Sequence, residues 1–412
     1  MSTPAHQHGG PVRENYHPPG YPVSALHTAF IVTDLTGRIH PLLLTPAWLA
    51  LAAVACWPWG ELRGAAAGLA LAFTVLDGIG LTLLPKLERS FGPVTPPLLA
   101  LALGHTAIVF ALGLIWPTSH ASPGVSAAAW SGLVMSGALN LAVSAAFLYA
   151  TWVEPFRIGV TQAQLHSPKL NGPTPLRLLQ LSDLHVERVT PRERTLLRLV
   201  EDLAPDVIVI TGDYLNLSYV HDPQAQADAH DLLARLCEIA RGPIYAITGS
   251  PPVDFHNVVP AIFRDLPITW LMDAIEEVHI NGHTVRLVGV RCTRERSRDV
   301  PRLRGLLDGS SEHPFTLLLY HSPDLMPEAV ELGVDLYLCG HTHGGQIRLP
   351  FFGAIITSSD FWKRYEMGRY EEGKTTLYVS RGLGMEGFGA PRARFLAPPE
   401  IVMWTLSGQA TT

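Results

Sequence analysis

Charged side chains are unevenly distributed along the 412-residue chain. No Asp, Glu, Lys or Arg occurs between Phe91 and Val153, whereas the sequence from Glu154 onward is ordinarily charged. The chain before Glu154 holds four apolar stretches, at about residues 41–59, 64–84, 96–116 and 126–152. A helix needs about 20 apolar residues to cross a hydrocarbon core of roughly 30 Å. The last three stretches reach that length, and the first, which contains Pro46 and Pro58, is a weaker candidate.

We therefore predict an all-α, four-helix transmembrane region over residues 41–152, preceded by an irregular Gly-, Pro- and His-rich tail at residues 1–40. The alternative is a buried helical domain of a soluble protein, but these stretches lack the polar face that such helices keep. The positive-inside rule favours a cytoplasmic C-terminal part. With four spans, the basic residues near the helices on the side of the C-terminal part would be Arg13, Arg38, Lys86, Arg89 and Arg157. The opposite side would hold only Arg63.

Two polar residues lie near the middle of predicted spans, Asp77 in the second and His105 in the third. Because polar side chains are costly inside a bilayer, both are candidates for a function. They would pair with each other, contact a lipid head group or substrate, or simply join the helices. A transporter built around these two residues alone is the weakest alternative.

Beyond residue 176 the apolar residues occur in short runs. Residues 153–176, with "HSPKLNGPTP", are interpreted as a linker. The runs that follow include "LRLLQLSD", "PDVIVITGD", "FTLLLYHS" and "VDLYLCGH", and amphipathic segments such as "ERTLLRLVEDLA" lie between some of them. Continuous aliphatic and β-branched runs are typical of strands buried on both faces. We therefore predict an α/β domain over residues 177–406, with helices covering the sheets.

Composition excludes some classes of function. The net charge of −6 and the lack of a basic run argue against a nucleic-acid partner. The four cysteines form no CxxC pair, so neither a disulfide framework nor a zinc knuckle is indicated.

Metal-binding side chains follow several of the predicted strands. In α/β sheets, ligands gather at the carboxyl ends of strands. Residues i and i+2 project to the same side there, so an Asp-x-His or His-x-His pair offers two donors in one direction. Imidazoles mixed with carboxylates suit Mn, Fe or Zn better than Mg or Ca. The candidate ligands are Asp183, His185, Asp213, His321, His341 and His343.

The segments around these residues closely resemble the motifs of the calcineurin-like metallophosphoesterase family, over about residues 175–405. "SDLH" resembles the family's Asp-x-His motif, "TGDYLN" its Gly-Asp motif, "YHSPD" its histidine motif and "GHTHGGQ" its Gly-His-x-His motif. The longer "CGHTHGGQIRLP" and the late "SRGLG" resemble the branch whose phosphoesterase domain often follows transmembrane segments. The resemblance implies a two-sheet metallophosphoesterase sandwich flanked by helices, placed after the four-helix region.

The resemblance also implies two divalent metal ions, which share a hydroxide and neutralise the phosphoryl oxygens during in-line displacement. Asp213 would bridge the two ions. The first ion would be held by Asp183, His185 and His343, and the second by His321 and His341.

Two further residues are weaker candidates for the site. Asn216 is a candidate to bind a phosphate or a metal-bound water, and a turn or capping role is the alternative. Arg381 is a candidate to bind the substrate phosphate, and packing beneath the site is the alternative.

One segment departs from the family pattern. Where the family has Gly-Asn-His followed by an acidic residue, this chain has "GSPPVD". Ser250 stands in place of the Asn that binds the second metal and offers a weaker neutral ligand. Pro251 stands in place of the His that protonates the leaving group, and it transfers no proton.

Three interpretations of this segment stay open. In the first, the loop is re-routed so that Asp254 supplies an oxygen ligand and His256 the proton. In the second, three protein ligands and water hold the second metal, and activity persists because a general acid contributes only about 10²–10⁴-fold. In the third, the protein binds a phosphorylated ligand without hydrolysing it.

The intact set of six ligands favours a working enzyme. We predict a multi-pass membrane protein with a cytoplasmic two-metal domain that hydrolyses a phosphomonoester or phosphodiester. Its location favours a lipid-linked or membrane-proximal substrate. The alternative is a catalytically degenerate, membrane-anchored protein that binds a phosphorylated ligand or acts as a regulator.

Overall fold

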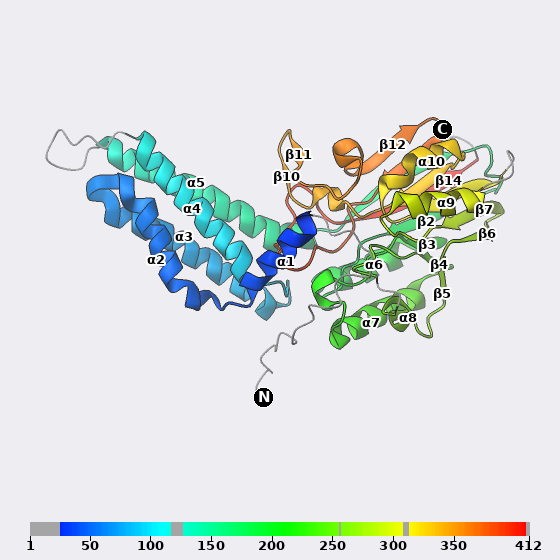
Figure 1. Cartoon of the computed structure of the whole chain (residues 1–412). Coiled ribbons are helices and arrows are strands. Elements are labelled where there is room, and N and C mark those ends of the chain that lie inside the picture. Colours follow the sequence, from blue (N-terminus) through cyan, green and yellow to red (C-terminus); the bar gives the residue numbers. More distant parts are fainter. Residues whose placement is uncertain (1–24, 117–126, 255–256, 308–312, 409–412) are drawn as a thin grey trace. The chain divides into compact units, whose positions relative to one another are not determined.

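The computed structural model describes residues 25–116, 127–254, 257–307 and 313–408 (Figure 1). Contacts between residues divide the chain into two units. Among the described residues, a helical unit contains residues 25–153 together with Gly387–Arg392, and an α/β unit contains Glu154–Glu386 and residues 393–408.

Five α-helices make up most of the helical unit: α1 (Ala25–Gly37), α2 (Thr45–Cys56), α3 (Arg63–Leu83), α4 (Thr95–Ile115) and α5 (Ala127–Leu148). Helix α1 lies inside the stretch that was expected to be irregular, and the Gly- and Pro-poor sequence "ALHTAFIVTDL" explains why it forms. Helix α2 packs against α3 and α4.

Among the described residues, three segments are long and apolar enough to cross a membrane: Pro41–Leu87, Thr95–Ile115 and Ala127–Phe156. The prediction of four spans is therefore not confirmed. The first segment contains both α2 and α3, and the non-helical backbone of Gly60 (φ 55°, ψ −120°) interrupts it between them. Helix α2 has 12 residues, too few for a span on its own at about 1.5 Å per residue, but the 3₁₀ turns Pro41–Leu44 and Trp57–Leu62 extend it at both ends.

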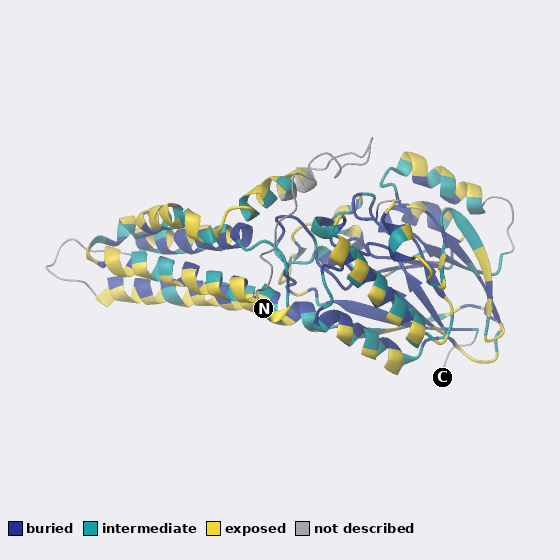
Figure 2. Cartoon of the chain, turned by 90° about the horizontal axis from the view of Figure 1, so that it is seen from below, coloured by how far each residue is buried: buried dark blue, intermediate teal, exposed yellow. Residues whose placement is uncertain are grey.

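Many residues of the long helices are exposed (Figure 2), and the helical unit exposes apolar side chains while it buries polar ones. Large apolar residues such as Leu76 (60 %) and Leu114 (64 %) are exposed, whereas Asp77 and His105 are buried. This distribution is the reverse of that in a water-soluble bundle.

Asp77 and His105 contact each other inside this unit. His105 Nε2 lies 2.7 Å from Asp77 Oδ2, and His105 Nδ1 lies 2.6 Å from Asn140 Oδ1. Of the alternatives that the sequence left open, the structure therefore shows the pair, and it links α3, α4 and α5.

The α/β unit contains two six-stranded sheets, which confirms the predicted class. In spatial order, the first sheet consists of β1 (Gly159–His166), β14 (Glu400–Ser407), β2 (Leu176–Leu181), β3 (Val207–Ile210), β4 (Ile244–Ala246) and β5 (Ile268–Trp270). The second consists of β12 (Gly368–Glu372), β13 (Thr375–Val379), β9 (Leu336–Cys339), β8 (Phe315–Leu319), β7 (His283–Gly289) and β6 (Ala274–Ile280). Strands β2 to β5 run parallel, as do β7, β8, β9 and β13.

The two sheets share one apolar core. Leu178 and Val209 of the first sheet belong to the same buried cluster as Leu317 and Leu338 of the second. The outer face of the second sheet is covered by α9 (Arg296–Leu307) and α10 (Met326–Glu331), whose apolar side chains join a second cluster. Helices α6 (Pro191–Leu203), α7 (Pro223–Ile239) and α8 (Val259–Ile262) complete the helical cover (Figure 1).

Strand β1 lies within the residues that were interpreted as a linker. It pairs in parallel with β14, from Gly159 opposite Glu400 to His166 opposite Ser407. Its polar sequence "GVTQAQLH" suits an edge strand with one solvated face. Such a strand has no continuous apolar run, and its partner lies more than 200 residues further along the chain.

Candidate metal centre

The six predicted ligands all follow central strands of the two sheets. Asp183 follows β2, Asp213 follows β3, His321 follows β8, and His341 and His343 follow β9. The carboxyl ends of these strands meet where the sheets pack together, so the side chains converge. They form two groups whose ligand atoms lie within 4.8 Å of one another: Asp183, His185 and His343, and Asp213, His321 and His341.

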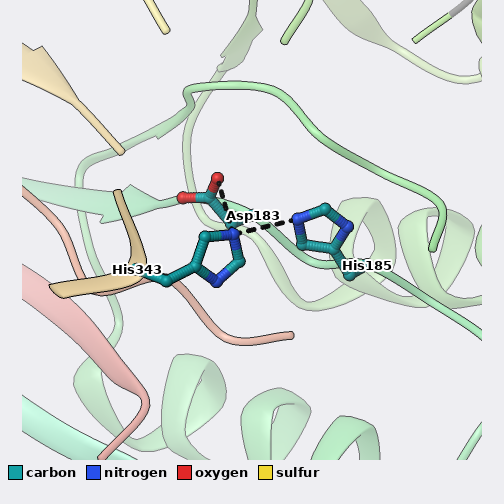
Figure 3. A group of neighbouring side chains, drawn as sticks. All are labelled: Asp183, His185 and His343. Atoms are coloured by element: carbon teal, nitrogen blue, oxygen red, sulfur yellow. Dashed lines mark hydrogen bonds and ion pairs between the residues drawn. The ribbon is translucent and has the colours of Figure 1, made fainter. Parts of the chain in front are cut away.

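The first group points its donor atoms at a common place (Figure 3). His185 Nε2 lies 3.1 Å from His343 Nε2, and Asp183 Oδ1 lies 3.6 Å from His343 Nε2. Two neutral imidazole nitrogens that face each other are stabilised by a shared proton or a cation. This donor set therefore fits a metal ion.

Asp213 lies between the two groups. Its Oδ2 is 3.5 Å from His185 Nε2 and 3.3 Å from His321 Nε2. One carboxylate therefore reaches donors of both groups, as a bridging ligand would.

In the second group, Ser250 adds a hydroxyl. His321 Nε2 and His341 Nδ1 are 3.2 Å apart, and Ser250 Oγ lies 3.2 Å from the first and 3.3 Å from the second. His321 Nδ1 is 2.8 Å from the Thr211 carbonyl, which leaves Nε2 as its metal-facing nitrogen.

Left-handed backbone turns aim the ligands inward. Five of the six ligands have positive φ, the exception being His321. Such values are uncommon for residues other than Gly and concentrate at functional sites. The five are Asp183 (50°), His185 (41°), Asp213 (58°), His341 (69°) and His343 (52°).

Close packing at Gly340 and Gly249 admits no larger residue. A Cβ at Gly340 would lie 2.0 Å from Asp183 Oδ2, and one at Gly249 would lie 2.1 Å from Asp213 Oδ1. Both carboxylates are thus held directly against the backbone of a neighbouring strand end.

Burial and charge give the histidines different pKa values. Burial lowers the pKa of His185 to about 4 and that of His341 and His343 well below the usual range, so these imidazoles are neutral at pH 7. Burial alone would lower the pKa of His321, but Asp213 raises it to about 9. Burial alone would raise the pKa of Asp213, but His321 reverses this and lowers it.

Asp254 contacts backbone groups rather than the imidazoles. Its Oδ2 accepts hydrogen bonds from the N–H groups of Asp213 (2.8 Å) and Gly249 (2.7 Å), and its Oδ1 accepts one from Tyr214 (3.0 Å). The carboxylate therefore fixes the turn that carries the bridging ligand. His256 lies outside the described residues.

The two weaker candidates have structural partners. Asn216 Oδ1 accepts from Ser218 N–H (2.9 Å) and its Nδ2 donates to the Met385 carbonyl (2.9 Å), a capping arrangement. Arg381 Nη2 lies 2.7 Å from Glu400 Oε2. Their roles toward substrate stay predictions.

Two arginines at the site were missed from the sequence. Arg294, whose φ is 60°, contacts His341 Nε2 through Nη1, and its Nη2 donates to the Ser358 carbonyl (2.7 Å). The buried Arg394 donates from Nη2 to backbone carbonyls, and the same nitrogen lies 3.2 Å from His343 Nδ1. For Arg394, the only signal in the sequence is an arginine placed among apolar residues in "APRARFLAPP". For Arg294, the surrounding sequence "RCTRER" carries no signal of a functional role.

Comparison with known proteins identifies the family. The family model for calcineurin-like phosphoesterases matches residues 176–345. The chain is 32 % identical over 286 residues to the uncharacterized metallophosphoesterase YkuE of Bacillus subtilis, covering 67 % of this chain and 94 % of that protein. The chain belongs to the calcineurin-like metallophosphoesterase family.

Two further relatives have named activities. The phosphodiesterase YaeI of Escherichia coli is 28 % identical, with 60 % of this chain and 89 % of that protein covered. The UDP-2,3-diacylglucosamine pyrophosphatase LpxG of Chlamydia trachomatis is 26 % identical, and the match covers 62 % of this chain and 92 % of that protein. The family and these relatives support a phosphoester hydrolase with a site for two divalent metals.

Proposed function

We propose that this protein is a membrane-anchored, two-metal phosphoesterase that hydrolyses a phosphomonoester or phosphodiester. The observation that carries the proposal is the place of Asp213, whose carboxylate reaches His185 of one ligand group and His321 of the other. Two divalent cations at this centre would activate water at neutral pH and neutralise the charge on the phosphoryl group.

The residues of this chain have separate tasks in the proposal. The three neutral imidazoles of His185, His341 and His343 each offer a lone pair to a cation. The Ser250 hydroxyl would complete the second group, and Asp254 would keep the Asp213 turn in place. The half-buried Arg294 lies at the edge of the second group, where its guanidinium would bind a phosphate oxygen. His256 stays a candidate proton donor.

We further propose a lipid-linked phosphate ester as the substrate. The part of the chain that the structure describes includes three segments with the length and composition of membrane spans, and one relative is named for a diacylated nucleotide sugar. The distribution of Lys and Arg near these segments favours an α/β unit on the cytoplasmic side.

The test is hydrolysis of a chromogenic aryl phosphodiester by the full chain in detergent micelles with Mn²⁺. The wild type is expected to turn over, and Asp213→Asn is expected to lose activity, because an amide cannot bridge two cations as a carboxylate does. The exposed Asp231→Asn on α7 is the matched control and should retain full activity.

A degenerate, phospho-ligand-binding protein is the second candidate, and the proline at position 251 favours it. This candidate would be supported by a folded wild type that binds two cations and inorganic phosphate. The same protein would hydrolyse no phosphoester with Mn²⁺, Zn²⁺ or Fe²⁺.

A further inference from the structure

The exposed apolar side chains of the α/β unit gather at one place. Among its described residues, seven large apolar side chains are exposed, and six of them lie between residues 349 and 362. The seventh follows Phe395, which pairs with Ile347 at the base of the same segment. We call these seven residues the apolar hairpin surface: Leu349, Phe351, Phe352, Ile355, Ile356, Trp362 and Leu396.

A short hairpin carries the centre of this surface. Strands β10 (Arg348–Leu349) and β11 (Gly353–Ala354) pair antiparallel, and the residues between them form the tip. Phe351 at the tip is fully exposed (111 %) and has a φ of 65°. A bulky residue with left-handed backbone is unfavourable, and Gly or Asn would adopt it more easily. The aromatic ring therefore adds no buried surface to the packing of the unit.

The base of the hairpin is rigid although its tip is exposed. Arg348 forms an ion pair with Glu366 (2.8 Å) and donates to the Gly344 carbonyl (2.7 Å). A Cβ at Gly345 would lie 2.3 Å from Ala354 Cβ, so the hairpin packs directly on the turn that follows His343. The apolar side chains are thus presented by a fixed element.

The surface adjoins the metal centre at both of its ends. It begins a few residues after His343, and the chain returns at Ser358, whose carbonyl lies 3.2 Å from His341 Nε2. A ligand that rests on the apolar side chains would therefore have its polar end beside the second group.

We propose that the apolar hairpin surface binds lipid: Phe351 and Phe352 enter the bilayer interface and bring a lipid-linked phosphoester to the metal centre. This inference rests on the proposed function. Large exposed apolar patches mark binding surfaces, and aromatic rings are favoured at membrane interfaces. Lipid is the occupant because the same chain carries membrane-length apolar helices. Lys363, with Nζ 3.6 Å from the centre of the Phe352 ring, adds the cation that suits an interface.

The depth of residue 351 tests the inference without any need for catalysis. The full chain, with Cys56→Ala and Cys237→Ala, is reconstituted in phosphatidylcholine–phosphatidylglycerol vesicles, and Phe351→Cys is labelled with an environment-sensitive fluorophore. We expect a blue-shifted emission that lipids with spin labels on their acyl chains quench. Glu277→Cys on the exposed edge strand β6 is the control and should stay unquenched.

Two outcomes would overturn the inference. A solvent-like, unquenched emission at position 351 would show that no lipid covers the tip. A blue-shifted emission that lipid quenchers do not affect would show that protein covers it instead, from the helical unit or a second copy.

A kinetic comparison links the surface to the reaction. We expect Phe351→Asn with Phe352→Ser to lower kcat/KM about tenfold for a long-chain alkyl aryl phosphodiester held in vesicles, because apolar contact with the substrate is lost. Turnover of a soluble aryl phosphodiester should be unchanged, since Asn tolerates the left-handed backbone and the metal centre is intact. Equal loss on both substrates would contradict lipid binding. If the wild type hydrolyses neither substrate, the proposed function fails, while the quenching measurement still decides on the surface.

Discussion

At the scale of single residues, the hydroxyl of Ser250 occupies the corner where the family pattern places an amide. It lies 3.2 Å from His321 Nε2 and 3.3 Å from His341 Nδ1, so it faces the same point as both imidazoles. We expect Ser250→Ala to weaken binding of the second cation by tenfold or more, in the range of about 10–100-fold seen for residues that support metal sites. Ser250→Asn should strengthen it, because an amide oxygen is the better neutral ligand.

Calorimetric titration of the apo protein with Mn²⁺, together with the metal content of the purified variants, measures this effect. Ser218→Ala is a suitable control, because that hydroxyl belongs to a residue outside both ligand groups. Two cations bound to Ser250→Ala with wild-type affinity would exclude Ser250 as a ligand.

Asp254 is placed to support the site through contacts with its backbone. Its carboxylate accepts three backbone N–H groups in a buried place. Asp254→Asn turns an NH₂ donor toward these N–H groups, and we expect the free energy of unfolding to fall by about 1–3 kcal/mol. Thermal denaturation of the apo protein measures this, with the exposed Asp231→Asn as control. Unchanged stability combined with loss of one bound cation would instead support Asp254 as a ligand.

The protonation of His321 predicts a pH dependence of metal binding. Because its pKa is raised to about 9, the apo protein carries a proton there at pH 7. A cation must displace this proton, so affinity for the second cation should rise with pH up to about 9 and then level off. Below about pH 6 the affinity for the first cation should fall as well, because burial raises the pKa of Asp183, which belongs to the first group, to about 6. Titration at pH 7 in buffers of different ionisation enthalpy should show proton release, and no release would contradict the prediction.

At the scale of elements, the buried strands were predictable and the edge strands were not. Strands β2, β3, β8 and β9 have apolar runs whose carboxyl ends carry ligands, so strand and site could be read together. Strand β1 alternates polar residues, and only its pairing with β14 makes it a strand. Arg294 was hidden for a similar reason: its contact with His341 joins loops of the second sheet that are 47 residues apart.

A buried hydrogen-bonded contact joins helices α3, α4 and α5. His105 bonds to Asp77 on α3 and to Asn140 on α5, and both of its nitrogens face acceptor oxygens. We expect His105→Leu to destabilise the helical unit by about 3–5 kcal/mol, because the Asp77 carboxyl group would stay buried without its hydrogen-bond partner. Asp77→Leu with His105→Leu should be clearly more stable than His105→Leu alone, since an apolar pair needs no partner. Thermal unfolding in detergent micelles measures both, and a double variant as unstable as the single one would contradict this account.

At the scale of the whole molecule, the number of spans determines which parts of the chain share a side of the membrane. Segment Pro41–Leu87 is long enough for one span, but it contains α2 and α3, which pack against each other across the interruption at Gly60. If both helices cross, the chain makes four passes, and Arg38 lies on the same side as the α/β unit. If the segment crosses only once, the chain makes three passes and the two lie on opposite sides.

We expect four passes with the α/β unit in the cytoplasm, because Lys and Arg near the helices gather on that side. Single cysteines at the exposed positions Arg38, Arg63 and Glu277, in a Cys56→Ala and Cys237→Ala background, test this with a membrane-impermeant maleimide. In intact cells only Arg63→Cys should react, and in inverted vesicles Arg38→Cys and Glu277→Cys should react instead. Reaction of Arg38→Cys and Glu277→Cys from opposite sides would establish three passes. Reaction of Glu277→Cys in intact cells would place the phosphoesterase unit outside the cytoplasm and direct the search for its substrate to the outer leaflet.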